Sequence, residues 1–133
     1  MTNSDGVAMS ANNVQRVAAV CEKFRTLDME IIMSCFTKEV TVNYNQLDTL
    51  RGKAALNEFL TPRYRVLGDY QLDKKIVMEE GDRVCVEVRA SYVNKNTQVA
   101  FQSRIFEILV FEENLISHWD YIGHSEEVIS WSI

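Results

Sequence analysis

The amino-acid sequence predicts an α+β protein in which helices precede an antiparallel sheet. Apolar residues recur at helical spacing in much of the N-terminal half, and two-residue alternation dominates the C-terminal half. Short polar turns separate the alternating segments, which favours antiparallel neighbours. A length of 133 residues fits one domain that can bury a core without a metal or disulfide staple. Helices segregated from such a sheet define the α+β class.

The N-terminal segment predicts a tail followed by an amphipathic helix. Residues 1–12 are rich in Ser, Asn and Gly and predict a flexible tail, so that the single domain spans residues 13–133. Asn13 is a favourable N-cap residue, and apolar residues follow it at helical spacing. We therefore expect a first helix that begins at Asn13 and ends near Leu27.

Two further helices and a strand are predicted before residue 63. Asp28 can cap a short second helix, because its side-chain oxygen can accept from the free amides of the first turn. Residues 40–44 alternate between apolar and polar side chains and predict a strand. A third helix is expected over residues 53–60, with Pro62 ending it.

The C-terminal half predicts a meander of four strands. The expected strands are residues 70–78, 83–93, 98–111 and 115–122. After them, residues 123–133 are partly apolar, and we expect this segment to pack on the domain or to form an interface. Its apolar residues are Val128, Ile129, Trp131 and Ile133.

Composition excludes several classes of function. The net charge of −5 and the lack of a basic stripe argue against nucleic-acid binding. No apolar run approaches the roughly 18 residues of a membrane span. Cys21, Cys35 and Cys85 show neither zinc-ligand nor CxxC spacing, and we expect them to be reduced and structural, which favours a cytoplasmic protein. No metal constellation or Gly-rich phosphate loop is present, so neither metal nor cofactor is expected.

Three segments carry a resemblance to a known superfamily. Residues 36–42 read FTKEVTV, residues 51–60 read RGKAALNEFL, and residues 111–121 read FEENLISHWDY. Their order and spacing resemble the nuclear-transport-factor-2-like superfamily, which includes ketosteroid isomerase, limonene epoxide hydrolase and SnoaL-like polyketide cyclases. The resemblance implies a cone: a curved antiparallel sheet wrapped around three N-terminal helices, enclosing one apolar pocket. It also implies a homodimer formed through the outer face of the sheet.

The resemblance also implies which side chains face the pocket. The catalytic-type aspartate of the family matches Asp120, and alternation along the strand then places His118 and Ile122 inside, with Trp119 and Tyr121 outside. Matching the other strands adds further inward positions. These are Val42, Tyr44, Val88, Gln102, Arg104, Phe106 and Ile108.

These positions suggest cofactor-free acid–base chemistry on a small hydrophobic molecule, of the isomerase, cyclase or epoxide hydrolase type. Asp120 would act as base or acid, with His118 and Arg104 tuning it. Tyr44 would donate a hydrogen bond to the substrate, and the other inward residues would bind it. The same residues have structural interpretations: Arg104 with Asp120 as an ion pair, His118 as a half-buried strand residue, and Tyr44 as a strand aromatic.

A non-catalytic ligand- or protein-binding module of the same fold is the alternative function. Tyr44 stands where the isomerases carry an aspartate base, so isomerase chemistry of that kind is not expected. Trp119 and Tyr121, if outside, would suit an interface. Glu87 and Arg89 are expected on the outer face as charge partners, although the alternative register would turn them inward.

Overall fold

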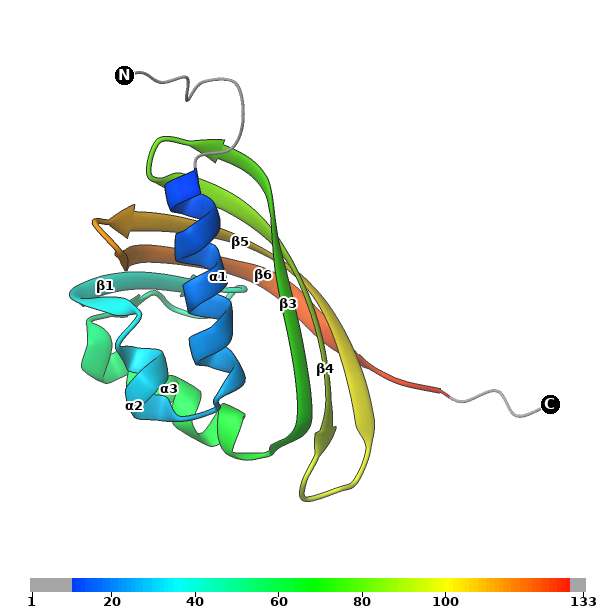
Figure 1. Ribbon diagram of the computed structural model, residues 1–133. Coiled ribbons are helices and arrows are strands. Elements are labelled where there is room, and N and C mark those ends of the chain that lie inside the picture. The colour runs from blue at the N-terminus through cyan, green and yellow to red at the C-terminus, as the bar shows by residue number, and fades with distance from the viewer. Residues whose placement is uncertain (1–10, 130–133) are drawn as a thin grey trace.

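A computed structural model describes residues 11–129 and contains three helices and six strands. The helices are α1 (Ala11–Arg25), α2 (Met29–Met33) and α3 (Lys53–Arg65). The strands are β1 (Phe36–Tyr44), β2 (Leu50–Arg51), β3 (Leu67–Glu80), β4 (Arg83–Asn94), β5 (Ala100–Glu112) and β6 (Leu115–Glu127). They form one curved sheet in the order β2-β1-β6-β5-β4-β3 (Figure 1). The predicted α+β cone is confirmed.

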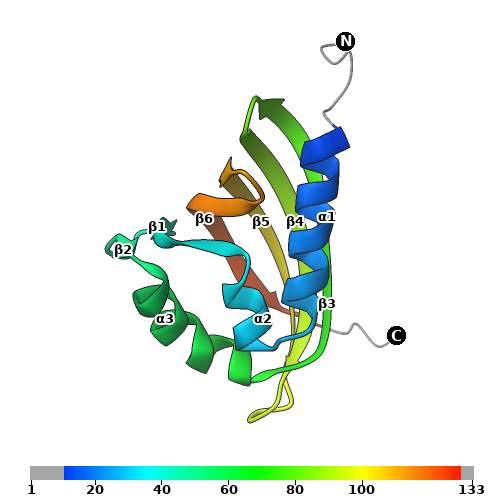
Figure 2. The same ribbon diagram turned by 60° about the vertical axis from the view of Figure 1, so that its left-hand side comes forward.

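All three helices lie on the concave side of the sheet. Helix α1 runs along β3, and α3 lies beside β1 and β2 at the opposite edge (Figure 2). The core fills the space between these layers, where the rings of Phe24 from α1 and Phe36 from β1 both contact the Trp119 ring of β6. Edge-to-face and tilted aromatic contacts of this kind stabilise a core beyond the area that they bury.

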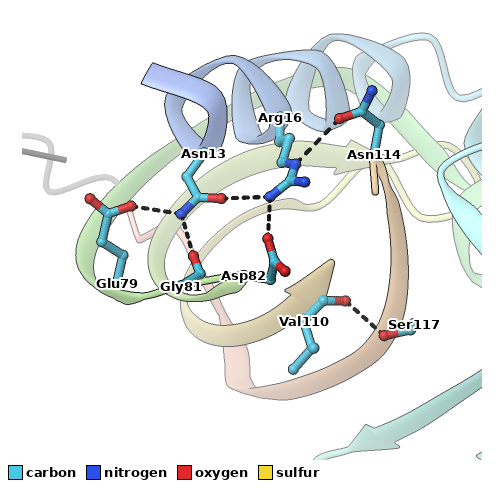
Figure 3. A network of polar contacts seen from close by, with 8 residues as sticks. All are labelled: Asn13, Arg16, Glu79, Gly81, Asp82, Val110, Asn114 and Ser117. Carbon is cyan, nitrogen blue, oxygen red and sulfur yellow. Dashed lines mark hydrogen bonds and ion pairs between the residues drawn. The ribbon is translucent and has the colours of Figure 1, made fainter. Parts of the chain in front are cut away.

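The start of α1 differs from the prediction. Ala11 begins the helix, so residues 11 and 12 are helical, while residues 1–10 of the predicted tail lie outside the described residues. Asn13 is not the N-cap but a buried helical residue with 1% of its surface exposed. Its Nδ2 donates to Oε1 of Glu79 and to the carbonyl oxygen of Gly81, at 2.7 and 2.8 Å (Figure 3). The Asn13 side chain therefore anchors α1 to the β3–β4 turn.

The second and third helices show one correct and one wrong prediction. Asp28 caps α2 as expected, since its Oδ1 accepts from the amides of Glu30 and Ile31. Helix α3 does not end at Pro62 but continues to Arg65. Pro62 leaves one carbonyl of the preceding turn without its usual amide, at Glu58. Both Pro62 and Glu58 are exposed, so water can satisfy that group.

The meander of β3 to β6 is confirmed, with two differences at its ends. Strand β3 begins at Leu67, three residues before the predicted start at residue 70, and β1 pairs with β6 in parallel rather than antiparallel fashion. Strand β6 continues to Glu127, and Val128 and Ile129 after it are exposed rather than packed. Trp131 and Ile133 lie outside the described residues.

A β-bulge in β6 determines which side chains face the concave side. Phe111 pairs with Ile116, but its neighbour Val110 pairs with His118, so Ser117 is an additional residue in β6. The Ser117 hydroxyl donates to the Val110 carbonyl oxygen at 3.2 Å (Figure 3). Ile116 and Trp119 are both buried, although they are three residues apart. Compared with unbroken alternation counted from Ile116, the bulge therefore exchanges the inward and outward positions in the rest of β6.

Candidate ligand-binding cavity

A cavity of 280 Å³ lies between α3 and the concave face of the sheet. Side chains from α1, β1, α3 and β3 to β6 line it, so almost every layer of the fold contributes. The polar and charged lining residues are Tyr44, Arg63, Tyr64, Tyr70, Lys74, Tyr92, Asn94, Ser103, Glu107, Tyr121 and Ser125. The apolar lining residues are Phe24, Val66, Leu67, Leu72, Val88, Ala90 and Ile105. The polar residues that line this cavity differ from the predicted ones.

The predicted facing of β6 is wrong, because of the bulge at Ser117. Trp119 is 2% exposed and Tyr121 lines the cavity, whereas both were expected outside. His118, Asp120 and Ile122 instead lie on the outer face, and Ile122 is 70% exposed. Asp120 and His118 therefore cannot act on a molecule inside the cavity.

The predicted facing of β5 is wrong by the same one-residue shift. Ser103, Ile105 and Glu107 line the cavity. The predicted inward set lies on the outer face, where Phe106 and Ile108 are 41% and 39% exposed. That set consists of Gln102, Arg104, Phe106 and Ile108. Gln102 and Arg104 line a separate open depression on the outer face.

The predicted facing of β1 and β4 agrees with the structure. Tyr44 is 8% exposed and lines the cavity, as does Val88. Val42 faces the same side as Tyr44, but it is fully buried in the core and does not line the cavity, so its predicted role in substrate binding is wrong. Glu87 and Arg89 lie on the outer face, which settles the choice that the sequence left open.

On the outer face, Arg104 and Asp120 do not form the predicted ion pair. Arg104 Nε donates to Glu87 Oε2 at 3.0 Å, and this hydrogen bond lowers the pKa of Glu87. Asp120 instead contacts His118 Nε2 at 3.0 Å and accepts from Asn43 Nδ2 at 2.8 Å. These groups are cross-strand and along-strand partners on a half-exposed surface.

A buried ion pair stands on the cavity wall. Lys74 Nζ of β3 lies 2.7 Å from Glu107 Oε1 of β5, and each side chain is 3% exposed. The second carboxylate oxygen of Glu107 accepts from the indole Nε1 of Trp119 at 3.0 Å. The Lys74 ammonium also lies 5.3 Å from the ring centroid of Phe24. Burying two charges is costly unless they are paired and hydrogen-bonded, and here both conditions are met.

Four tyrosines surround the ion pair with hydroxyl groups that remain protonated. Burial raises the pKa of Tyr44, Tyr64, Tyr70 and Tyr121, and the Glu107 charge raises each of them further. Tyr44 and Tyr121 stack with ring centroids 3.9 Å apart. Among the described residues, the hydroxyls of Tyr64 and Tyr70 have no hydrogen-bond partner, so both can donate to a ligand.

Four residues of the cavity wall were not predicted as site residues: Lys74, Glu107, Tyr64 and Tyr70. Lys74 lies between Leu72 and Ile76, and Glu107 lies between Ile105 and Leu109, so each charge interrupts an apolar alternation. A charged residue on the buried face of a strand is the signal that could have identified the pair. The inward register derived from Asp120 assigned Glu107 to the outer face, and no facing was predicted for Lys74.

The described residues also limit other kinds of site. No helix within residues 11–129 is long and apolar enough to cross a membrane. The same residues contain no cluster of three or more His, Cys, Asp or Glu that could hold a metal ion. Cys21 and Cys35 are buried as predicted, and desolvation raises the pKa of Cys35 to about 11. Buried thiols of this kind behave as small apolar side chains.

Solved structures of low sequence identity share the fold. A protein from Jannaschia sp. CCS1, assigned provisionally as a SnoaL-like polyketide cyclase, superposes with a TM-score of 0.75 at 12% identity, covering 92% of this chain and 90% of that one. SalBIII, an epoxide hydrolase/cyclase-like enzyme of pyran ring formation in salinomycin, gives 0.70 at 17% identity and covers 85% and 93%. TerC, co-crystallised with polyporic acid, gives 0.69 at 23% identity and covers 84% and 91%.

The family assignment comes from the sequence match. No curated protein matches the chain. The family model of the SnoaL-like domain matches residues 17–119, which include most of α1, all of β1 to β5 and the part of β6 that carries the bulge. The chain therefore belongs to the SnoaL-like family.

Proposed function

We propose that this protein is a cofactor-free acid–base enzyme that acts on a small, largely apolar molecule in the cavity, with Glu107 and Lys74 as the reacting pair. The observation that carries the proposal is the ion pair of 2.7 Å on the wall of a 280 Å³ cavity. A buried ion pair contributes little to net stability compared with apolar residues of similar size. Aromatic and aliphatic side chains, the tyrosine rings included, supply most of the cavity lining, and a pocket of this kind with a few convergent polar groups is the usual form of a small-molecule site.

The pair is suited to proton transfer next to a carbonyl group. Glu107 would take a proton from a carbon of the substrate, and the electron pair of that C–H bond would move onto the carbonyl oxygen as an enolate. The Lys74 ammonium and the hydroxyl of Tyr64 or Tyr70 would stabilise the enolate oxygen. Return of the proton to a different atom completes an isomerisation, and attack of the enolate carbon on an internal electrophile completes a cyclisation.

The same residues could also open an epoxide. Lys74 would donate a hydrogen bond to the epoxide oxygen while Glu107 activates a water molecule. The folds of SalBIII and of an epoxide hydrolase from M. tuberculosis, which matches at a TM-score of 0.63 and 14% identity, are compatible with this chemistry. Proton abstraction remains the primary proposal, because it uses both members of the pair without a positioned water.

Deuterium exchange tests the proposed chemistry without knowledge of the natural substrate. In D₂O, ¹H NMR follows the loss of the enolisable protons of 2-tetralone, a small neutral aromatic ketone. We expect the wild-type protein to accelerate exchange over buffer and Glu107→Gln to lose this acceleration. Asp120→Asn changes a carboxylate on the outer face and is the matched control, so it should exchange at the wild-type rate. Equal rates for wild type and Glu107→Gln would reject the proposal.

A second proposal concerns the outer face, where the alternative function would reside. We propose that the chain forms a homodimer through this face, which exposes Phe106, Ile108 and Ile122 on neighbouring strands. Apolar side chains clustered on an outer sheet face favour an interface. Sedimentation equilibrium tests this: Ile122→Lys should shift a dimer to monomer, and a monomeric wild-type protein would reject it.

A further inference from the structure

The formal charges of the side chains that line the cavity do not sum to zero. The charged residues among them are Arg63, Lys74 and Glu107. The ion pair of Lys74 with Glu107 is neutral as a whole, so Arg63 leaves the cavity with a formal charge of +1. The complete chain carries a net charge of −5. The positive charge is therefore a local property of this site and not of the protein surface in general.

Arg63 stands at the mouth of the cavity. It lines both the cavity and an adjoining open depression, and Tyr44 is the other residue that the two share. Its guanidinium carbon lies 4.3 Å from the ring centroid of Phe59 and 5.4 Å from that of Tyr44. Stacking on these two rings holds the guanidinium at the entrance. Among the described residues, no carboxylate lies within ion-pair distance of Arg63, so the guanidinium is available to a ligand.

The interior of the cavity suits an aromatic ring that carries an oxygen. The stacked rings of Tyr44 and Tyr121 and the ring of Tyr92 present aromatic surface. Tyr64 and Tyr70 provide two hydroxyl donors that no described residue uses. The volume of 280 Å³ lies just below the roughly 300–1,000 Å³ of sites for drug-sized ligands, which indicates about two fused rings.

We propose that the cavity is selective for a small aromatic monoanion, whose acid group pairs with Arg63 at the mouth and whose ring oxygen accepts from the tyrosine hydroxyls inside. This inference rests on the proposed function and names its substrate class. An Arg–carboxylate contact is the charge-assisted, bidentate type of hydrogen bond. Because Glu107 is already neutralised by Lys74, the anion meets no uncompensated negative charge inside the cavity.

Two probes that differ only at the acid group, a carboxylate in one and a neutral amide in the other, test the inference. The probes are 6-hydroxy-2-naphthoate and 6-hydroxy-2-naphthamide, which have the same rings and the same hydroxyl group. Isothermal titration measures their dissociation constants for the wild-type protein at low and high salt. We expect the naphthoate to bind at least about fivefold more tightly at low salt, which corresponds to about 1 kcal/mol, and this preference to shrink at high salt.

Variants of α3 assign the preference to one side chain. Arg63→Gln should abolish the preference, and Arg63→Lys should retain part of it, because an ammonium keeps the charge but not the bidentate geometry. Arg65→Gln is the matched control: Arg65 is an exposed arginine of the same helix that does not line the cavity. It should keep the wild-type preference.

The outcomes separate this inference from the proposed function. Equal affinity for both probes in the wild type, or a preference that survives Arg63→Gln, would overturn the monoanion selectivity. The deuterium exchange of neutral 2-tetralone, with its dependence on Glu107, would be unaffected by that result. Absence of binding by either probe would also overturn the inference. If the wild-type protein did not accelerate deuterium exchange but still preferred the naphthoate, the acid–base proposal would be rejected. The cavity would then be a binding site for aromatic anions.

Discussion

Removal of one charge of the Lys74–Glu107 ion pair should destabilise the fold far more than removal of both charges. Glu107→Gln leaves a buried ammonium facing a neutral amide, and Lys74→Met leaves a buried carboxylate whose remaining partner is Trp119 Nε1. Each side chain is 3% exposed, so water cannot compensate. Breaking a buried pair by removal of one partner costs about 3–5 kcal/mol, a large part of the 5–15 kcal/mol by which a domain of this size is stable.

The double variant completes a mutant cycle that measures how much of this loss of stability comes from the interaction between Lys74 and Glu107. With Lys74→Met and Glu107→Gln combined, the neutral amide still accepts from Trp119 and no charge is buried. We expect the double variant to be more stable than either single variant, with a coupling free energy of at least about 2 kcal/mol. Urea unfolding followed by circular dichroism supplies the four free energies of unfolding.

An exposed pair provides the control for this cycle. Arg83 and Glu80 approach to 2.8 Å at the β3–β4 turn, with side chains 60% and 82% exposed. The cycle of Arg83→Met and Glu80→Gln should give a coupling of about 0–1 kcal/mol. If the Lys74–Glu107 cycle gave no larger coupling than this surface pair, the description of a desolvated ion pair on the cavity wall would be refuted.

Three further predictions concern other parts of the structure. A Cβ at position 123 would lie 2.9 Å from the Ile105 Cα, so Gly123→Ala should lower the free energy of urea unfolding by about 1–3 kcal/mol, and an unchanged value would contradict this close approach. Asn13→Ala removes two buried donations to the β3–β4 turn and should cost about 1–2 kcal/mol in the same assay, whereas the exposed Asn12→Ala should cost little. Because burial raises the pKa of four of the five tyrosines, the unfolded chain releases their protons first, and stability should be complete below about pH 10 and fall above it. Absorbance at 295 nm and circular dichroism should then change together, and tyrosine ionisation well before unfolding would contradict the burial.

The sequence predicted the fold well because its periodicities are local. Helical spacing in α1 and alternation in β4 depend only on neighbouring residues, and both predictions were confirmed. The facing of Val88 and Tyr44 followed from alternation within unbroken strand segments. Helix α3 was wrongly predicted to end at Pro62. The helix is exposed at that point, so water can replace the hydrogen bond that proline cannot donate, and most of the energetic cost is removed.

The candidate site was predicted less well because facing is a property of the whole hairpin. Alternation along β6 was anchored on Asp120, and the additional residue Ser117 lies between the hairpin turn and that anchor. Both faces of β5 carry apolar residues, so its own pattern does not determine which face is buried. Trp119, a large ring three residues after Ile116, was a local indication of the true orientation of β6. Sequence reasoning needed a pairing partner for each residue, which only the assembled sheet provides.

The bulge at Ser117 also has a consequence for how such a cavity could change during evolution. Deletion of this single codon would remove the additional residue and place Trp119 two positions after Ile116, so Trp119 and Tyr121 would stay on the concave side and His118 and Asp120 on the outer face. A one-residue insertion or deletion near the tip of this hairpin could thus be absorbed by gain or loss of the bulge, without exchange of the aromatic, hydroxyl-bearing wall for the residues of the outer face. In a fold that hosts several chemistries, such a bulge allows the length of a hairpin to vary while the lining of the cavity is kept.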